Sequence, residues 1–109
     1  MSAATYQKIA ELFPGRWDRN YAAAKLRTDP LYMAVGVHLR HSKLPLLDLG
    51  CGLGLLAFFL RSRGIDAPIH CLDYDLRKIQ IAKYATNQAG LEDVSFAHHD
   101  ARDGLPDHH

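Results

Sequence analysis

The hydrophobic residues of the chain follow one pattern before Pro45 and another after it. Before Pro45 they recur every three or four residues, which is typical of helices. The pair Pro14-Gly15 ends a first helix, and Asp29 followed by Pro30 is typical of a helix start. The pattern therefore predicts three helices, over residues 5–13, 19–27 and 30–41. The apolar positions of the third helix fall at helical spacing: Leu31, Ala34, Val35 and Leu39.

After Pro45, short apolar runs alternate with longer amphipathic segments. The runs predict strands over residues 46–49, 67–72 and 94–97, and the segments between them predict helices over 55–63 and 76–88. Gly64 and Gly90 follow these helices in the usual terminating position, and Asp75 is a suitable N-cap for the second. The inner face of that second helix is expected to carry Ile79, Ala82, Thr86 and Ala89. The order β-α-β-α-β predicts an α/β fold with a parallel sheet and right-handed crossovers.

Three parallel strands in the order 3-2-1 form half of a doubly wound, Rossmann-like sheet. We therefore divide the chain into an N-terminal helical lid or cap, residues 1–43, and a β-α-β-α-β half, residues 44–109. This second part looks truncated, because the sequence stops where another helix and strand would be expected. The strand over 46–49 would then be an unpaired apolar edge, which predicts a homodimer or a domain-swapped assembly.

Composition narrows the class of protein. A chain of 109 residues with 48% hydrophobic content is ordinary for one globular domain. The net charge of +1 gives no indication of nucleic-acid binding. The apolar run at 53–60 is too short to cross a membrane, and the N-terminus lacks a signal-peptide pattern. Two cysteines, Cys51 and Cys71, make no disulfide framework, and a cytoplasmic location is the default expectation.

Three glycines, Gly50, Gly52 and Gly54, separate the first strand candidate from the helix after it. So much glycine is entropically costly, which indicates unusual backbone conformations or close approach of a ligand. In an open α/β sheet, ligands bind beyond the carboxyl ends of the strands, where this loop lies. Its N–H groups and the helix start favour anionic groups. The dinucleotide fingerprint G-x-G-x-x-G would require a third glycine at Leu55, so the spacing departs from it.

The segment LLDLGCGLG, residues 46–54, resembles the first motif of the class I S-adenosylmethionine-dependent methyltransferases. HCLDYDLRKIQIAKYA, residues 70–85, is similar to the second motif of that family, and VSFAHHDARDGLP, residues 94–106, to its third. The three motifs follow one another at family-like spacing and cover the chain downstream of the N-terminal helices. The resemblance implies S-adenosylmethionine as the cofactor and transfer of its sulfonium methyl group to a nucleophilic acceptor.

The resemblance also implies roles for residues of the first two motifs. Gly50, Gly52 and Gly54 would form the floor under the methionine and ribose parts of the cofactor. Cys51 belongs to the same loop, and we expect its thiol to be small, buried and inert. Asp48 would orient the loop and interact with the amino end of the cofactor, or it would simply hydrogen-bond the loop.

At the end of the second strand, Asp73 would accept hydrogen bonds from both ribose hydroxyls, since a carboxylate has two acceptor oxygens. A solvated strand-end carboxylate is the alternative. Tyr74 would pack against adenine, or it is an ordinary partly buried aromatic residue. Asp100 would accept from the adenine amino group, with Asp103 as a competitor, and the Ala101 N–H would face a ring nitrogen.

Other polar residues carry weaker expectations. His98 and His99 are adjacent on a strand, where side chains point to opposite faces, so we expect no metal site. The resemblance implies that an N-terminal helix covers the cofactor as a lid, with Tyr21, Lys25 and Arg27 facing its carboxylate; a solvated helix face is the alternative. Trp17 would pack on the core or line the mouth of the site.

No catalytic residue is assigned, because the acceptor pocket of this family usually lies in a later half than the one represented here. Two competing functions remain open. A non-catalytic, methyltransferase-like module would bind the nucleoside or serve as a scaffold. A nicotinamide-dependent Rossmann oxidoreductase is disfavoured by the glycine spacing and by Asp48 before the loop.

Overall fold

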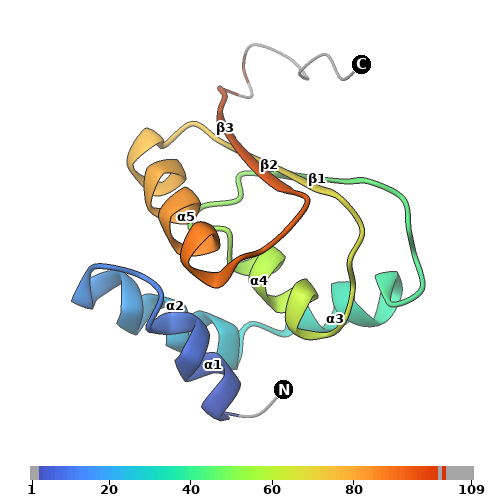
Figure 1. Ribbon diagram of the computed structural model, residues 1–109, viewed down its shortest axis with the longest axis horizontal. Coiled ribbons are helices and arrows are strands. Elements are labelled where there is room, and N and C mark those ends of the chain that lie inside the picture. Colours follow the sequence, from blue (N-terminus) through green and yellow to red (C-terminus); the bar gives the residue numbers. More distant parts are fainter. Residues whose placement is uncertain (1–2, 101, 103–109) are drawn as a thin grey trace.

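The computed structural model describes residues 3–100 and 102, in which three helices precede a β-α-β-α-β unit (Figure 1). The helices are α1 (Ala3–Ala10), α2 (Arg16–Thr28), α3 (Pro30–Leu39), α4 (Leu55–Ser62) and α5 (Leu76–Ala89). The strands are β1 (Leu46–Leu49), β2 (Ile69–Asp73) and β3 (Val94–His98).

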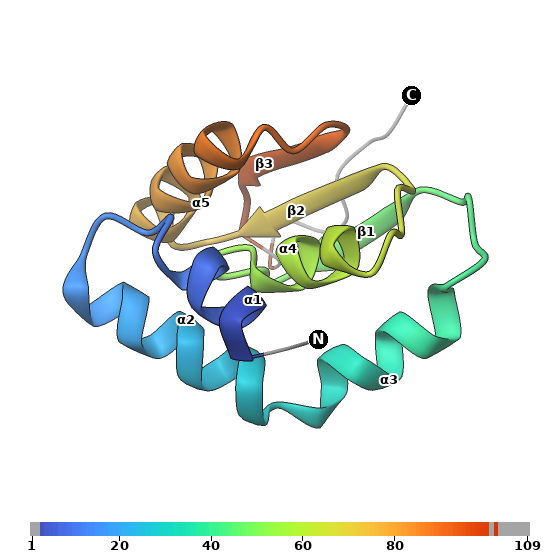
Figure 2. The ribbon, with the colours of Figure 1, turned by 60° about the horizontal axis from the view of Figure 1, so that its bottom comes forward.

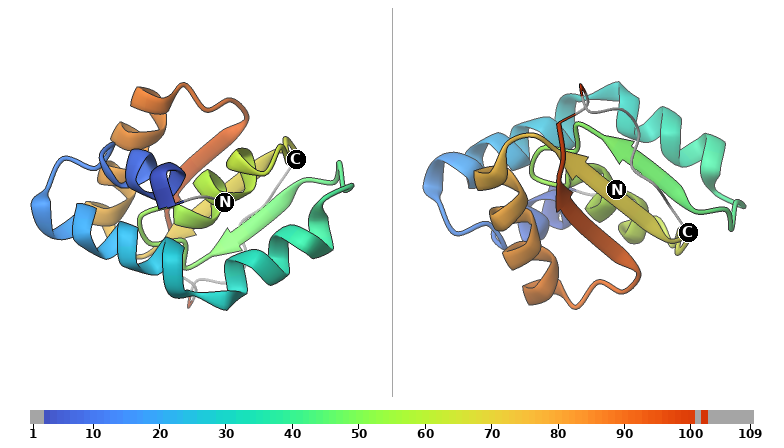
Figure 3. Two further views of the ribbon diagram at one scale, coloured as in Figure 1. Left: turned by 90° about the horizontal axis from the view of Figure 1, so that it is seen from below. Right: turned by 90° about the horizontal axis from the view of Figure 1, so that it is seen from above.

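The three strands form one parallel sheet in the order β1-β2-β3, with β2 in the centre. Leu46 is paired with Ile69 and Asp73 with His98, so all three carboxyl ends meet at one edge. The predicted α/β class and the strand order 3-2-1 are thereby confirmed. The helices lie on one side of the sheet, as Figures 2 and 3 show. Within the described residues, no element covers the opposite face.

The hydrophobic core lies between the sheet and the helices. Phe58, Phe59 and Leu60 of α4 and Ile69 and Cys71 of β2 are buried there. The N-terminal helices contribute to the same cluster: Ile9 of α1, Phe13 of the following turn, and Ala22 and Leu26 of α2. Each fully buried large side chain of this kind stabilises the fold by roughly 1.5–3 kcal/mol. The helices of residues 1–43 and the sheet therefore share one core.

Helix α3 packs on the core with part of its predicted apolar face, since Val35 and Leu39 are partly buried against the core cluster. Gly36 is buried, and a Cβ atom placed on it would lie 3.0 Å from the Phe59 ring. The Tyr32 ring stacks on the same ring at 5.8 Å between centroids. Leu31 is 60% exposed and Ala34 is exposed. Close packing on Phe59 thus selects the side of α3 that carries a glycine.

Several element boundaries differ from expectation by a few residues. Helix α2 begins at Arg16 rather than residue 19, and β2 begins at Ile69 rather than residue 67. Pro68 has no N–H with which to continue a strand ladder, so regular pairing starts after it. In α5, Ile79, Ala82 and Thr86 are buried as predicted, but the fourth buried residue is Ala85, and Ala89 is exposed.

Candidate functional site

The glycine loop after β1 is held against the end of β2 by backbone hydrogen bonds. The N–H groups of Gly50 and Cys51 both donate to the Leu72 carbonyl oxygen, at 2.8 and 3.0 Å. Gly50, Gly52 and Gly54 have φ of +73°, +57° and +79°, a left-handed conformation that side chains disfavour. A Cβ atom at Gly50 or Gly52 would meet no atom within 4 Å, so this stretch of backbone faces open space. The loop is therefore accessible to a ligand.

Asp73 connects this loop to helix α5. Its Oδ2 accepts a hydrogen bond from the Gly52 N–H at 2.8 Å, and its Oδ1 accepts one from the Asp75 N–H at 2.8 Å. Asp75 is the N-cap of α5, as expected, with its Oδ1 accepting from the Lys78 N–H. The Asp73 side chain is only 7% exposed, so it is not a solvated carboxylate. Each of its oxygens has a second lone pair with which to accept from a ligand hydroxyl.

Asp48 lies beneath the loop, at the position on β1 that is paired with Cys71. Burial raises the pKa of its carboxyl group to about 6, and the nearby charge of Asp73 adds to this shift. Burial also raises the pKa of the Tyr32 hydroxyl, with smaller contributions from Tyr21, Asp29 and Asp48. The acidic pair Asp48 and Asp73 thus lies next to the glycine loop, and the half-buried Tyr32 is near enough to Asp48 to be affected by its charge.

A cavity of about 70 Å³ opens where the three carboxyl ends meet. It is lined by Leu49, Gly50, Leu72, Asp73, Tyr74 and His99. Tyr74 is 75% exposed. The His98 ring contacts the Tyr74 carbonyl oxygen at 2.8 Å, and the His99 N–H donates to the Asp73 carbonyl oxygen at 2.9 Å. These contacts fix the end of β3 beside the end of β2.

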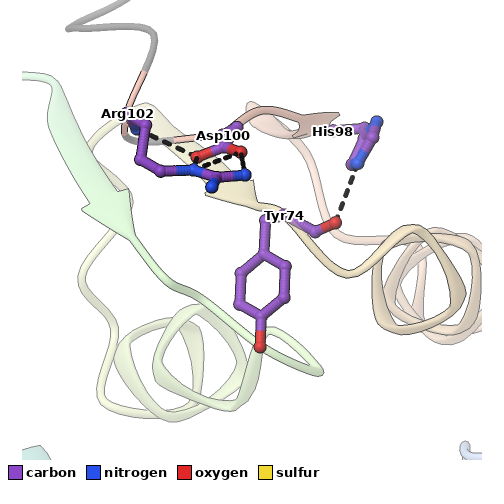
Figure 4. A network of polar contacts seen from close by, with 4 residues as sticks. All are labelled: Tyr74, His98, Asp100 and Arg102. Atoms are coloured by element: carbon purple, nitrogen blue, oxygen red, sulfur yellow. Dashed lines mark hydrogen bonds and ion pairs between the residues drawn. The ribbon is translucent and has the colours of Figure 1, made fainter.

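Asp100 points toward its neighbour Arg102. Figure 4 shows its carboxylate facing the Arg102 guanidinium, while Tyr74 projects in another direction. The Arg102 N–H and Nε donate to this carboxylate, and these contacts hold the pKa of Asp100 below its usual range. The pair is exposed, so solvent screens it and another donor can replace the guanidinium. Ala101 and Asp103 lie outside the described residues.

The three residues of α2 that were predicted to face the cofactor, Tyr21, Lys25 and Arg27, each have different neighbours. The Lys25 ammonium pairs with the Asp29 carboxylate at 2.8 Å, next to the start of α3. Arg27 lines a cavity of about 270 Å³ that contains Tyr6 and Phe59 but no residue of the glycine loop. Tyr21 is half-exposed and Trp17 is 84% exposed, so Trp17 is not part of the core.

An ion pair that the sequence pattern did not reveal ties α2 to the sheet half. Arg77, in the first turn of α5, donates to the buried Asp18 carboxylate at 2.9 Å. The two residues are 59 positions apart, and no local pattern links them. Through this contact, the start of α2 lies beside the start of α5, two residues after Asp75.

A larger and more apolar cavity lies elsewhere. About 360 Å³ lies between α1, α4 and the end of α5, lined by residues such as Ile9, Leu12, Phe58 and Leu91. It includes no residue of the glycine loop and neither Asp73 nor Tyr74. The functional site is therefore indicated by its converging polar groups rather than by cavity size.

In comparisons with known proteins, the sequence and the fold of this chain match those of methyltransferases. A family model described as "Methyltransferase domain" matches residues 40–108. A protein-L-isoaspartate O-methyltransferase structure is 26% identical, with 71% of this chain covered and a TM-score of 0.56. YjhP from E. coli is 30% identical, with 68% covered and a TM-score of 0.55. Coclaurine N-methyltransferase, solved with N-methylheliamine and SAH, covers 91% of this chain at a TM-score of 0.64 and 14% identity, and so shows the fold alone.

The chain spans 25%, 31% and 32% of the length of these three structures. No curated protein matches it in sequence. Among residues 3–100 and 102, none of the helices combines the length and apolar character needed to cross a membrane.

Proposed function

The chain belongs to the methyltransferase domain family, and we propose that it carries the S-adenosylmethionine-binding part of a methyltransferase. One observation carries the proposal: the glycine loop, the end of β2 and the residue after β3 line one cavity at the carboxyl edge of the sheet. Ligands of open α/β sheets bind at this edge.

The residues present fit the adenosyl half of such a cofactor. Asp73 has acceptor lone pairs left over for the two ribose hydroxyls, and the exposed Tyr74 ring offers a flat surface for adenine. Asp100 would exchange its Arg102 partner for the adenine amino group. Gly50 and Gly52 leave room for the methionine part to approach the backbone. The cavity is smaller than the roughly 300–1,000 Å³ of a complete small-molecule site, so the described residues form one wall.

S-adenosylmethionine, when bound, supplies an activated methyl group on a sulfonium ion that is already a good leaving group. The task of this chain is therefore to bind and orient, which lowers the barrier by proximity. The loop and Asp73 would fix the ribose, and Asp48 would hold the loop and the amino end. The methyl acceptor and a base that serves it are not assigned to any residue of this chain.

We propose that the helices of residues 1–43 act as a cap over this edge. The Asp18–Arg77 ion pair supports this, because it joins α2 to α5 close to Asp73 and Asp75. Tyr21 and Asp48 both lie near enough to Tyr32 to raise the pKa of its hydroxyl group. The cap would therefore reach the methionine end of the cofactor through Tyr21 rather than through Lys25 or Arg27, which have other surroundings.

We also propose that two copies pair along the edge of β1. In the described chain β1 is paired only with β2, and Leu47 and Leu49 are half-exposed. Sedimentation velocity tests this: a concentration-dependent dimer is expected, and Leu47→Lys should abolish it. A monomer at all concentrations would contradict the proposal.

A cytoplasmic location forms part of the proposal. Both cysteines are free, which is typical of proteins in reducing compartments.

Calorimetric titration with S-adenosylhomocysteine tests the cofactor proposal. Wild-type protein should bind it and should not bind NADH with similar affinity. Tyr74→Ala should weaken binding by about 1–3 kcal/mol, the scale of stacking a base on an aromatic ring. Tyr84→Ala is the matched control, because Tyr84 is a half-exposed tyrosine of α5 outside the cavity. A preference for NADH, or equal loss in both variants, would overturn the assignment.

A further inference from the structure

A cavity of about 390 Å³ lies between the end of α3 and the end of α4. Helix α3 ends shortly before β1 begins, and α4 ends before β2 begins, so the cavity is at the amino edge of the sheet, opposite the glycine loop (Figures 2 and 3). Its lining consists of Gly36, Val37, Arg40, Ser62 and Arg63. Among the described residues, no Asp or Glu lines it, so the lining carries positive charge alone.

The two segments that form the cavity are basic, although the chain as a whole is nearly neutral. Residues 30–47 and 55–65 together contain Arg40, Lys43, Arg61 and Arg63 but no Asp or Glu, whereas the whole chain has 13 Lys and Arg against 12 Asp and Glu. Lys43 pairs with Asp66, and the Arg61 guanidinium donates to backbone carbonyl oxygens. Within residues 3–100 and 102, no carboxylate pairs with Arg40 or Arg63.

The Arg63 guanidinium is positioned by the Phe59 ring. Its central carbon lies over the ring, 6.0 Å from the centroid, which is a cation–π arrangement. Phe59 is only 1% exposed, and Gly36 of α3 packs against the edge of its ring. Arg40 follows Gly36 by one helical turn and has a helical backbone, so it lies on the same side of α3. The two arginines therefore face one cavity from two different helices.

Neither guanidinium is needed to complete the end of its helix. A basic side chain near a helix C-terminus often bonds the last carbonyl oxygens of that helix. At the end of α4, however, the backbone N–H groups of residues 63–65 bond the carbonyl oxygens of residues 59–61. At the end of α3, the Ser42 N–H donates to the Leu39 carbonyl oxygen at 2.9 Å. The side-chain donors of both arginines are thus left for another acceptor.

We propose that this cavity binds a small molecule through a phosphate or diphosphate group. A guanidinium is always charged and presents parallel N–H donors that match two phosphate oxygens. Two such groups on one cavity, with no carboxylate between them, favour an anion of two or more charges. The volume of about 390 Å³ is within the roughly 300–1,000 Å³ typical of small-molecule sites. The net charge of +1 favours a small anion over the long backbone of a nucleic acid.

Titration of the ¹⁵N-labelled protein with sodium pyrophosphate, at constant pH and ionic strength, tests this site. Saturable amide shifts should centre on residues 36–40 and 62–63. Arg40→Gln and Arg63→Gln should each weaken pyrophosphate binding by about three- to tenfold. Arg16→Gln is the matched control, because it removes the same charge from an exposed position of α2 outside the cavity, and it should leave the affinity unchanged.

Three results of this titration would overturn the proposal: no saturable shift, shifts centred elsewhere, or equal weakening in Arg16→Gln. Both cavity arginines are exposed, so their variants should keep the amide spectrum of the folded protein. A flotation assay with phosphatidic acid vesicles distinguishes a lipid headgroup from a small molecule. Vesicle binding that depends on Arg40 and Arg63, without saturable pyrophosphate shifts, would also overturn the proposal.

This site and the cofactor edge are at opposite ends of the strands, so the two can be tested independently. S-adenosylhomocysteine has no phosphate and should not displace pyrophosphate. Displacement would place both ligands in one site and contradict a separate phosphate site. Failure of S-adenosylhomocysteine to bind would count against the cofactor function and leave the pyrophosphate result standing.

Discussion

The N–H of Gly52 donates a hydrogen bond of 2.8 Å to Oδ2 of Asp73, 21 residues further along the chain. The other oxygen of the same carboxylate accepts from the Asp75 N–H, also at 2.8 Å. One buried side chain thus joins the glycine loop after β1 to the start of α5. Because these bonds are made away from water, a backbone N–H that loses its partner there is costly.

Replacement of Asp73 by asparagine should therefore destabilise the fold. An amide offers one acceptor oxygen in place of two, so the N–H of either Gly52 or Asp75 faces a donor. We expect a loss of about 1–3 kcal/mol in the free energy of unfolding, measured with urea. Asp66→Asn is the control, since the Asp66 carboxylate forms an exposed ion pair with Lys43, and it should change stability by less than about 0.5 kcal/mol. Equal effects of the two substitutions would contradict this role of Asp73.

Asp48 should give the protein a distinctive pH dependence. Its pKa is raised to about 6 in the folded protein, above the ordinary value of 3.8, so the folded state holds this proton more tightly than the unfolded state. Its contribution to stability is present below pH 3.8 and is lost as the pH rises to about 6. Allowing for its partial exposure, we expect the loss to be about 1–2 kcal/mol.

Comparison with Asp48→Asn isolates this contribution. Asp29, Asp66 and Asp100 have lowered pKa values and act in the opposite direction, but their effects cancel between the two proteins. The stability difference, wild type minus variant, should fall between pH 4 and 7 in urea unfolding. Parallel stability curves would show that Asp48 titrates normally.

Gly54 and Gly64 form a matched pair for testing the packing beneath the loop. Both have a left-handed backbone, with φ of +79° and +77°. A Cβ atom at Gly54 would lie 2.7 Å from the Phe96 ring, whereas one at Gly64 would meet nothing within 4 Å. Gly64→Ala should cost about 1–2 kcal/mol from backbone strain alone, and Gly54→Ala a further 1–3 kcal/mol or so from crowding. Similar melting temperatures for the two variants would contradict this packing.

Arg77 should hold the start of α2 in place. Its removal leaves the buried Asp18 carboxylate without the guanidinium that pairs with it. In Arg77→Ala we expect the amides of α2 to lose about 1–3 kcal/mol of protection against hydrogen exchange. Lys78→Ala, at the next position, which is also exposed, should leave α2 unchanged. Unchanged exchange in Arg77→Ala would mean that the core alone holds the helix.

The strands and helices after Pro45 could be predicted from the sequence because they depend on residues close to one another in the chain. The run 46–49 lies between a proline and a glycine, and it is a strand with those bounds. Asp75 and Gly90 cap α5 through contacts within a few residues of themselves. Local spacing of this kind sets strand and helix positions without knowledge of the rest of the fold.

The parts that could not be predicted depend on contacts between distant segments. The close packing of α3 depends on Gly36 against Phe59, 23 positions away, where a Cβ atom would lie 3.0 Å from the ring. The Asp18–Arg77 pair likewise has no signature in either segment alone. Motif resemblance indicated Asp73 as a ligand residue, yet its hydrogen bonds to the loop and to α5 required the structure.

The most direct test of the central claim is a titration of the ¹⁵N-labelled protein with S-adenosylhomocysteine, followed by amide chemical shifts in NMR, which also detects weak binding. The largest saturable shifts should fall on Gly50, Gly52, Asp73, Tyr74 and His99, the loop and strand ends that surround the small cavity. Shifts concentrated around Ile9, Leu12 and Leu91 at the larger apolar cavity, or no saturable shift at all, would contradict the account.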